Sequence, residues 1–440
     1  MDVSRRGFVA GGVASIAVAG TLDTLFTTSA GADEGEAYGY GPLIADPAGI
    51  LDLPAGFSYK VLSAEGSSLG PAGGVVPGAH DGTGLFPGST PGGSRLVRNH
   101  ELGTSGTKAV AAANLTYDPK AFGGTSTVDV DASGNVVSQY VSIAGTATNC
   151  AGGVTPWGTW LTCEETEGIS GQTKTHGWVF EVDPLGVKTI PEPIKPLGRF
   201  AHEAVCIDNH SHIAYLTEDS SGPFGLFYRF IPNNNRGGYH CYQDGGKLQA
   251  MRVPGVDDLS SVQVPGTVLT GIEWVDVPDP EATTVSVRKQ FALTGQVTRS
   301  QKLEGAWFDS KKAYFVASYS RTSSGAAGNH AGQVWKYDPK ANTLSLEFIF
   351  KPGGKYDSPD NITVSPYGGG VMLAEDGDGE QYLVGTTRYA KSFPMARNAF
   401  NDSEFTGVIY SEDRRTLFAN RQSPGVTFAI TGPFDKIRAR

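Results

Sequence analysis

The sequence predicts an all-β protein and, within that class, a β-propeller built as a single domain. Glycine accounts for 59 of the 440 residues, about twice the roughly 7% found in average proteins. A hydrophobic fraction of 39%, with 10% aromatic residues, provides enough apolar material for a core. A glycine-dense, aromatic sequence with little helical periodicity is typical of many short strands joined by tight turns.

A repeated pattern arranges these strands in hairpins. An aromatic or β-branched segment runs into an Asp-Pro turn in residues 115–120, 178–184 and 334–340, and residues 226–232 form a looser copy. Each copy is followed by a second β-rich segment, such as residues 343–350. Such hairpins, dispersed along the chain, predict the blades of a propeller. The alternative, a pair of β-sandwiches, lacks a linker of distinct composition to divide it.

The first 32 residues have the composition of an export signal. Arg5 and Arg6 precede an apolar run rich in Gly and Ala over residues 9–20, and an A-x-A-like cleavage site ends at Ala32. This order is that of a signal peptide, and the paired arginines indicate the twin-arginine type. We therefore expect a signal peptide over residues 1–32, recognised by the twin-arginine export machinery. One propeller domain over residues 33–440 would then be periplasmic or extracellular.

Charge and hydropathy limit the partners. A net charge of −10 and a pI near 5.3 argue against a nucleic-acid partner, which requires a basic face. A membrane anchor is the alternative reading of the N-terminus. Because that run is only weakly hydrophobic and is interrupted by Asp23, we expect no stable membrane insertion.

The four cysteines are too few and too scattered for a disulfide framework. Cys163 and Cys206 lie in apolar segments and are most simply buried small hydrophobic residues. Cys150 differs because it lies in a polar, glycine-rich loop. A metal-binding role and a structural role remain equally open for this thiol.

Acidic residues gather in short clusters where apolar segments begin or end. Adjacent acids such as Glu164 and Glu165 repel each other unless a cation lies between them. If the strands share a central channel, the clusters converge. All-oxygen sites suit Ca²⁺ first, whereas His100, His202 or a Cys150 thiolate would admit iron or zinc. The clusters contain Glu101, Glu164, Glu165, Glu203, Glu218, Asp219, Glu304, Asp360, Glu375 and Asp376, and a loop at His80 and Asp81 adds a further candidate.

Several catalytic motifs are missing from the sequence, including the G-x-S-x-G elbow, the H-E-x-x-H helix and the Walker loop. The longer segments resemble the PhoX-type alkaline phosphatases, which are exported by the twin-arginine route. The resemblance is carried by residues 98–101, 149–165, 199–203, 216–219, 304–307, 358–361, 373–376 and 425–433.

This resemblance implies a six-bladed propeller whose central cavity holds iron (Fe³⁺) and calcium (Ca²⁺) and hydrolyses phosphate esters. The ten clustered acids become candidate metal ligands, and Cys150 becomes the candidate thiolate ligand of iron. Glu164, Arg199 and Cys150 are the candidate catalytic residues. We expect a monomer that acts on a small phosphoester through a metal-activated oxo or hydroxo nucleophile. Arg199, Arg288 or Arg388 would clamp the phosphate oxygens.

Two other functions stay open at this point. One is a different propeller hydrolase, such as a calcium-dependent lactonase or a diesterase. The other is a non-catalytic binding propeller that calcium stabilises. A different propeller hydrolase would contain calcium but no iron, unlike a PhoX-type enzyme. A binding propeller would turn over no ester.

Overall fold

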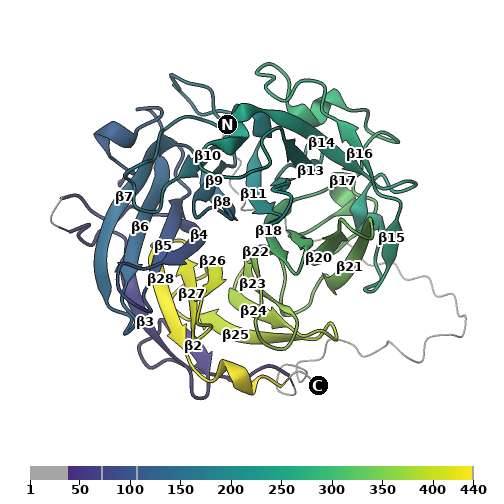
Figure 1. Cartoon of the computed structure of the whole chain (residues 1–440). Helices are drawn as coiled ribbons and strands as arrows, with labels where there is room; N and C mark the ends of the chain where they lie inside the picture. Colours follow the sequence, from purple (N-terminus) through teal and green to yellow (C-terminus); the bar gives the residue numbers. More distant parts are fainter. Residues whose placement is uncertain (1–37, 71–72, 106–107, 439–440) are drawn as a thin grey trace, which may run out of the picture.

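Six antiparallel sheets are arranged around a common axis in the computed structural model (Figure 1), which describes residues 38–70, 73–105 and 108–438. Their first strands line a central channel. The predicted signal peptide lies outside these residues. We number the sheets as blades 1 to 6 in chain order. The first strands of neighbouring blades contact one another around the whole ring, in the order β4, β8, β11, β18, β22, β26 and back to β4. The predicted all-β propeller with six blades is confirmed.

Each blade is a meander whose first strand lines the channel. Blade 1 contains β4 (His80–Pro87), β5 (Ser94–His100), β6 (Gly123–Val130) and β7 (Val136–Thr146). Blade 2 contains β8 (Asn149–Val154), β9 (Trp160–Glu164) and β10 (Val179–Val182). Blade 3 contains β11 (His202–Ile207), β12 (Ala214–Glu218), β13 (Gly225–Pro232), β14 (Gly246–Arg252) and β16 (Glu273–Asp276), with β17 (Arg299–Ser300) paired to β13.

Each of the other three blades also contains one or two strands from a distant part of the sequence. Blade 4 contains β18 (Leu303–Asp309), β19 (Lys312–Ala317), β20 (Gly332–Asp338), β21 (Thr343–Phe350) and, at its outer edge, β15 (Val268–Thr270). Blade 5 contains β22 (Pro359–Val364), β23 (Val371–Glu375), β24 (Tyr382–Thr386) and β25 (Ser392–Asn398), extended by β2 (Leu51–Pro54) and β1 (Leu43–Ile44). Blade 6 contains β26 (Phe405–Tyr410), β27 (Thr416–Arg421) and β28 (Val426–Thr431) and is completed by β3 (Ser58–Ala64). This last pairing joins the two ends of the chain and closes the ring.

The hydrophobic core is divided among the interfaces between blades, because each sheet buries both of its faces. Six buried clusters fill the six interfaces, one between each pair of neighbouring blades. Glycines in the first strands allow the blades to approach closely. A Cβ on Gly153 would lie 1.8 Å from the carbonyl oxygen of Val205 in the next blade.

Most of the predicted hairpin pattern appears as strands. Residues 343–350 coincide with β21, and the Asp338 side chain accepts two backbone N–H groups of the following turn. Residues 115–120 are the exception: they lie outside the strands, and Leu115 is the last residue of a short 3₁₀ helix, Ala113–Leu115. There Asp118 accepts hydrogen bonds from the backbone of Thr173 and Lys174 instead of ending a strand.

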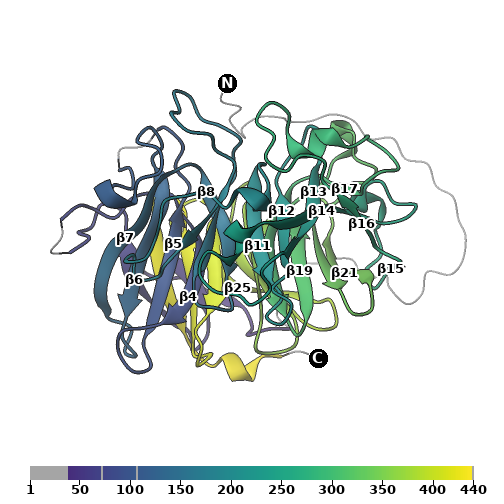
Figure 2. The same cartoon turned by 45° about the horizontal axis from the view of Figure 1, so that its top comes forward.

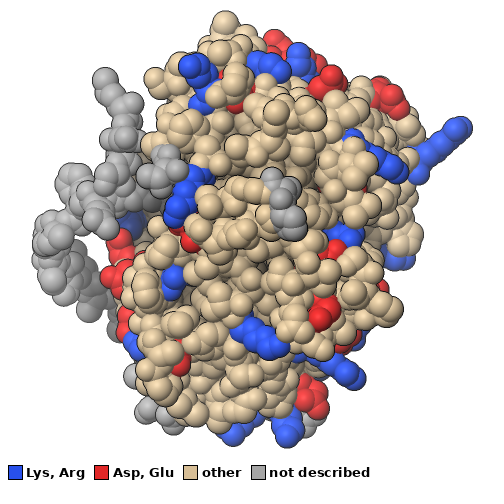
Figure 3. All heavy atoms as spheres, turned by 90° about the vertical axis from the view of Figure 1, so that its left-hand side faces the viewer, with Lys and Arg blue, Asp and Glu red and all other residues tan. Residues whose placement is uncertain are grey.

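The remaining short 3₁₀ helices lie in loops, at Lys195–Leu197, Cys241–Asp244, Leu259–Ser261, Val287–Gln290, Thr322–Ser324 and Phe434–Lys436. Within the described part of the chain, no helix has the length and hydropathy needed to cross a membrane. Figure 2 shows the strands of neighbouring blades standing side by side around the axis. On the side shown in Figure 3, charged residues of both signs are scattered among uncharged ones and form no large patch of one sign.

Candidate metal centre

The same backbone junction occurs at one end of the channel in all six blades. The start of each first strand pairs with the end of the second strand, as in His80 with His100 and Asn149 with Glu164. The equivalent pairs are His202 with Glu218, Leu303 with Ala317, Pro359 with Glu375 and Phe405 with Arg421. A β-bulge interrupts each first strand just after this pair or, in blade 6, one residue later, and bulges re-aim the side chains beside them.

A second hydrogen bond fixes the residue that follows the second strand. The backbone N–H of that residue donates to the carbonyl of the residue that directly precedes the first strand. In blade 2, for example, Glu165 N donates to the Thr148 carbonyl at 2.9 Å. The other donors and acceptors are Glu101 and Ala79, Asp219 and Ala201, Ser318 and Lys302, Asp376 and Ser358, and Gln422 and Glu404. Each junction therefore presents side chains from rigid backbone at the same level of the channel.

The side chains presented there form a cluster that we call the acidic ring. It consists of Asp81, Glu101, Cys150, Glu165, Glu203, Asp219, Glu304, Asp360, Asp376 and Glu404. The ring contains four groups of three residues that share members. Within each group, the three ligand atoms lie within 4.8 Å of one another. These groups are Cys150, Glu165 and Glu203; Glu165, Asp219 and Glu304; Glu203, Glu304 and Asp360; and Asp360, Asp376 and Glu404.

Asp81 and Glu101 complete the ring in blade 1. Gln422 of blade 6 donates through Nε2 to Glu101 Oε2 at 2.6 Å and to Asp81 Oδ2 at 3.4 Å. Burial, followed by the charges of Glu101 and Asp360, raises the pKa of Asp81 well above its ordinary value. Asp81 is thus part of the same electrostatic unit as the groups of three.

The negative charge of the ring is poorly compensated by the protein itself. Burial and neighbouring carboxylates raise the pKa of four members well above the usual range, namely Asp81, Glu165, Glu203 and Glu404. We call these the four raised carboxyls. Among the described residues, none donates a hydrogen bond to the buried Glu203 Oε1. A buried carboxylate oxygen without a donor is costly unless a cation approaches it, so the donor set fits a bound metal.

Cys150 is the one sulfur atom in the acidic ring. Its thiol donates to the carbonyl of His202 at 3.3 Å, and burial raises its pKa well above the ordinary value. The neighbouring carboxylates of Glu203 and Glu165 raise the pKa further. A thiolate at this position therefore needs a strongly bound cation, which is the condition under which metal sites deprotonate cysteine.

The sequence placed Glu164, Glu218 and Glu375 among the metal ligands, but the structure does not bring them into the acidic ring. Each is the last residue of a second strand, and its successor belongs to the ring. Successive side chains of a strand point in opposite directions. These three glutamates therefore point into their blades, where each accepts a backbone N–H group near the start of the third strand.

These glutamates have further partners inside the blades. Glu164 accepts from Ala147 N, Gly177 N and Trp178 N and contacts His176 Nδ1 at 2.6 Å. Tyr228 donates its hydroxyl to Glu218 at 2.7 Å. Such saturated carboxylates stabilise the strand ends that carry the acidic ring.

The basic residues also differ from the sequence prediction. Arg199 donates to the carbonyls of Glu167 and Ala282. Arg288 pairs with Glu218 at 3.0 Å, and Arg388 is exposed and lies over the Tyr389 ring. The cation inside the ring is Lys302, which pairs with Asp219 and with Glu304. No sequence signal marked Lys302, because it lies before its strand and no acid is directly adjacent to it.

The histidines next to the ring have other partners. His100 contacts the Gly78 carbonyl and Ser126 Oγ through its two ring nitrogens. His202 stacks on Phe200 and contacts the Gly198 carbonyl. Burial lowers the pKa of His202 to about 3. Neither imidazole joins a group of metal-ligating atoms in the described residues.

A closed propeller whose carboxylates and one thiol gather at one end of its channel has the ligand atoms of a metal-binding propeller. The family model described as alkaline phosphatase PhoX matches residues 38–139 and 132–425. The chain therefore belongs to the PhoX alkaline phosphatase family and is a phosphoric ester hydrolase.

A solved structure of a PhoX protein agrees with this fold. PhoX from Pseudomonas fluorescens, solved in complex with vanadate as a transition state analogue, superposes with a TM-score of 0.67 at 17% identity. That similarity covers 90% of this chain and 98% of the other. A gluconolactonase, XC5397 from Xanthomonas campestris, has a TM-score of 0.42 at 10% identity, with 90% and 98% of the two chains covered. No curated protein sequence matches the chain.

Proposed function

We propose that the protein is an exported phosphomonoesterase whose acidic ring holds iron and calcium. The observation that carries the proposal is the grouping of Cys150 Sγ with Glu165 and Glu203 beside groups formed by carboxylates alone. A thiolate with carboxylates suits iron, whereas carboxylate oxygens alone suit calcium. When bound, these cations supply positive charge for the phosphate oxygens and lower the pKa of water.

The residues of the chain divide the remaining work. Cys150, Glu165 and Glu203 would hold iron, and Glu304, Asp360, Asp376 and Glu404 would hold calcium. Lys302 lies between Asp219 and Glu304. From this position its ammonium group would bind an oxygen of a phosphate that faces the ring.

Arg199 and Arg288 have a positioning role in this proposal. Arg288 contacts Glu167 at 3.6 Å as well as Glu218, and Arg199 binds the Glu167 carbonyl. Glu167 follows the ring member Glu165 by two residues. The two guanidinium groups therefore hold the loop that carries Glu165 and do not themselves point at the substrate.

The sequence and the closed ring support a proposal for the location and the assembly of the enzyme. The signal peptide expected over residues 1–32 supports export by the twin-arginine route to the periplasm or beyond. Because every member of the acidic ring comes from one chain, we propose that a monomer is active. Sedimentation of the exported protein tests this, and loss of activity on dissociation of an oligomer would contradict it.

Metal analysis and spectroscopy test the function directly. We expect the exported protein to contain both iron and calcium, to absorb visible light through a ferric thiolate, and to hydrolyse p-nitrophenyl phosphate. Chelation should abolish the hydrolysis. The variant Cys150→Ser should lose iron and the visible band while it keeps bound calcium. A colourless protein that holds calcium alone and opens lactones, or hydrolyses no ester, would contradict the proposal.

A further inference from the structure

Directly beside the acidic ring, the channel widens into a cavity of about 530 Å³. All six first strands contribute to its wall. Several lining residues are the immediate successors of ring members: Gly82 follows Asp81, Ala151 follows Cys150 and Gly305 follows Glu304. Asn361 also lines the cavity and donates to Asp360 Oδ1 at 2.9 Å. The cavity thus begins where the ring ends.

The chemistry of the wall is opposite to that of the ring. No Asp, Glu, Lys, Arg or His is among the described residues that line the cavity. Small residues leave the space open, and Trp160, Trp307, Phe308 and Ile207 supply apolar surface. Cavities of this volume that combine apolar side chains with a few polar ones, here Thr83, Thr155 and Asn361, are typical of small-molecule sites.

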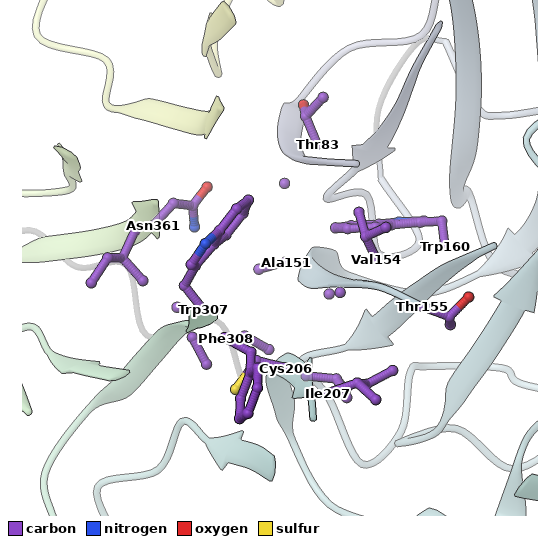
Figure 4. A pocket seen from close by; sticks show the side chains of 18 of the residues that line it. Thr83, Ala151, Val154, Thr155, Trp160, Cys206, Ile207, Trp307, Phe308 and Asn361 are labelled. Atoms are coloured by element: carbon purple, nitrogen blue, oxygen red, sulfur yellow. The ribbon is translucent and has the colours of Figure 1, made fainter. Parts of the chain in front are cut away.

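Trp307 is the distinctive residue of this wall. It follows Glu304 on β18, and its indole extends into the cavity between Asn361 and Ala151 (Figure 4). It packs against the cluster shared by blades 4 and 5 and also against the cluster shared by blades 6 and 1. Its side chain therefore reaches across the channel.

The hydrogen bonding of Trp307 also sets it apart. The other five tryptophans each donate their indole N–H to an acceptor within the protein. None of the residues that the structure describes accepts a hydrogen bond from the Trp307 N–H, and the side chain is only half-buried. Tryptophan N–H groups in packed surroundings normally find a partner. An indole face and an unused donor that border a neutral cavity offer a stacking surface to a ligand.

We propose that this cavity is the subsite for the leaving group of the ester, and that it selects flat, uncharged aromatic groups by stacking on Trp307. The proposal rests on the proposed function, because the phosphate must lie at the acidic ring. Because the cavity begins at the successors of ring members, the ester group of a phosphate held at the ring would face its uncharged wall. The subsite gives the enzyme a preference for aryl phosphates over esters of small polar alcohols.

The test compares the binding of phenylphosphonate and methylphosphonate to the metal-loaded protein by calorimetric titration. Both share the phosphonate head, so the ratio of their affinities reports on the phenyl group alone. We expect the wild-type protein to bind phenylphosphonate about tenfold more tightly. Trp307→Ala should bring the ratio close to one, whereas the control Trp274→Ala, in the outer strand β16, should leave it unchanged.

A second variant fills the cavity instead of emptying it. Val154, a partly exposed lining residue, can be replaced by Trp. Val154→Trp should weaken phenylphosphonate binding and leave methylphosphonate binding unaltered, which keeps the test valid if Trp307→Ala fails to fold. Equal affinities in the wild-type protein, or an unchanged ratio in both variants, would overturn the subsite alone. Failure of both phosphonates to bind the wild-type protein would overturn the proposed function together with it.

Discussion

Two adjacent glutamates allow a sharp test of how the blades present the acidic ring. Glu164 points into blade 2, whereas Glu165 belongs to the ring. We expect Glu164→Gln to lower stability while metal binding survives. Glu165→Gln should do the reverse, because it removes a ligand and leaves the hydrogen bonds of the blade intact. The two variants make the same chemical change one residue apart, so each is the control for the other.

The magnitude for Glu164→Gln follows from its four contacts. Glu164 accepts three backbone N–H groups at 2.9–3.1 Å and contacts His176 Nδ1 at 2.6 Å. The glutamine NH₂ group cannot accept, so about two of these hydrogen bonds are lost. At about 1.5 kcal/mol for each bond to a charged group, the cost is about 3 kcal/mol. An unfolding entropy of about 2.1 cal/mol/K per residue, over roughly 400 residues, converts this to a melting temperature about 4 °C lower.

The assay combines calorimetric unfolding, metal content and turnover of p-nitrophenyl phosphate. For Glu165→Gln we expect a fall in activity of about 100-fold or more, since even the partners of metal ligands cost 10- to 100-fold when removed. Its metal-free form should melt at the wild-type temperature or above, because burial and the charge of Asp219 disfavour the ionised Glu165 carboxyl. Loss of metal with an unchanged melting temperature in Glu164→Gln, together with full activity in Glu165→Gln, would refute the reasoning.

Four further predictions follow from the structure. The four raised carboxyls stabilise the metal-free fold below their ordinary pKa values of 3.8 and 4.5, and this stability is lost as the pH rises through their raised pKa values. The melting temperature of the protein in chelator should therefore fall with rising pH. Added calcium should remove this fall. Lys302→Met should reduce kcat/KM by about 100-fold, whereas Lys312→Met, which breaks a peripheral pair with an aspartate of β20, should not change it. Gly153→Ala should prevent assembly of the blades, since its Cβ would overlap a backbone carbonyl, whereas Gly103→Ala has room and should fold, as judged by circular dichroism. Calcium added to chelated protein should raise the melting temperature even in Cys150→Ser, and failure to do so would contradict separate sites for the two metals.

The sequence was sufficient for the architecture because the hairpin signals are local. Asp-Pro turns, alternating strands and frequent glycines occur within short windows, and they predicted the all-β propeller. The failure at residues 115–120 shows the limit of this reasoning. There the same Asp-Pro turn places Asp118 where its carboxylate accepts hydrogen bonds from the backbone of a distant loop. Only the tertiary contacts distinguish this Asp-Pro turn from one that ends a strand.

The site was only partly predictable, for a geometric reason. Acidic pairs such as Glu164 and Glu165 mark the ends of second strands, but the sequence does not tell which member faces the channel. That choice depends on the register with the first strand and on the bulge beside it. Glu404 and Lys302 each occupy the position directly before a first strand. No single residue type occupies this position in all six blades. Their place in the ring is visible only when the six junctions are compared.

The most direct test of the account is anomalous X-ray diffraction from crystals of the exported protein, recorded on both sides of the iron absorption edge. We predict an iron peak in contact with Cys150 Sγ and with the carboxylates of Glu165 and Glu203. Density for calcium is predicted beside Asp360, without an iron signal. An iron peak bound instead by Glu164, or the absence of any cation within the acidic ring of active protein, would contradict the account.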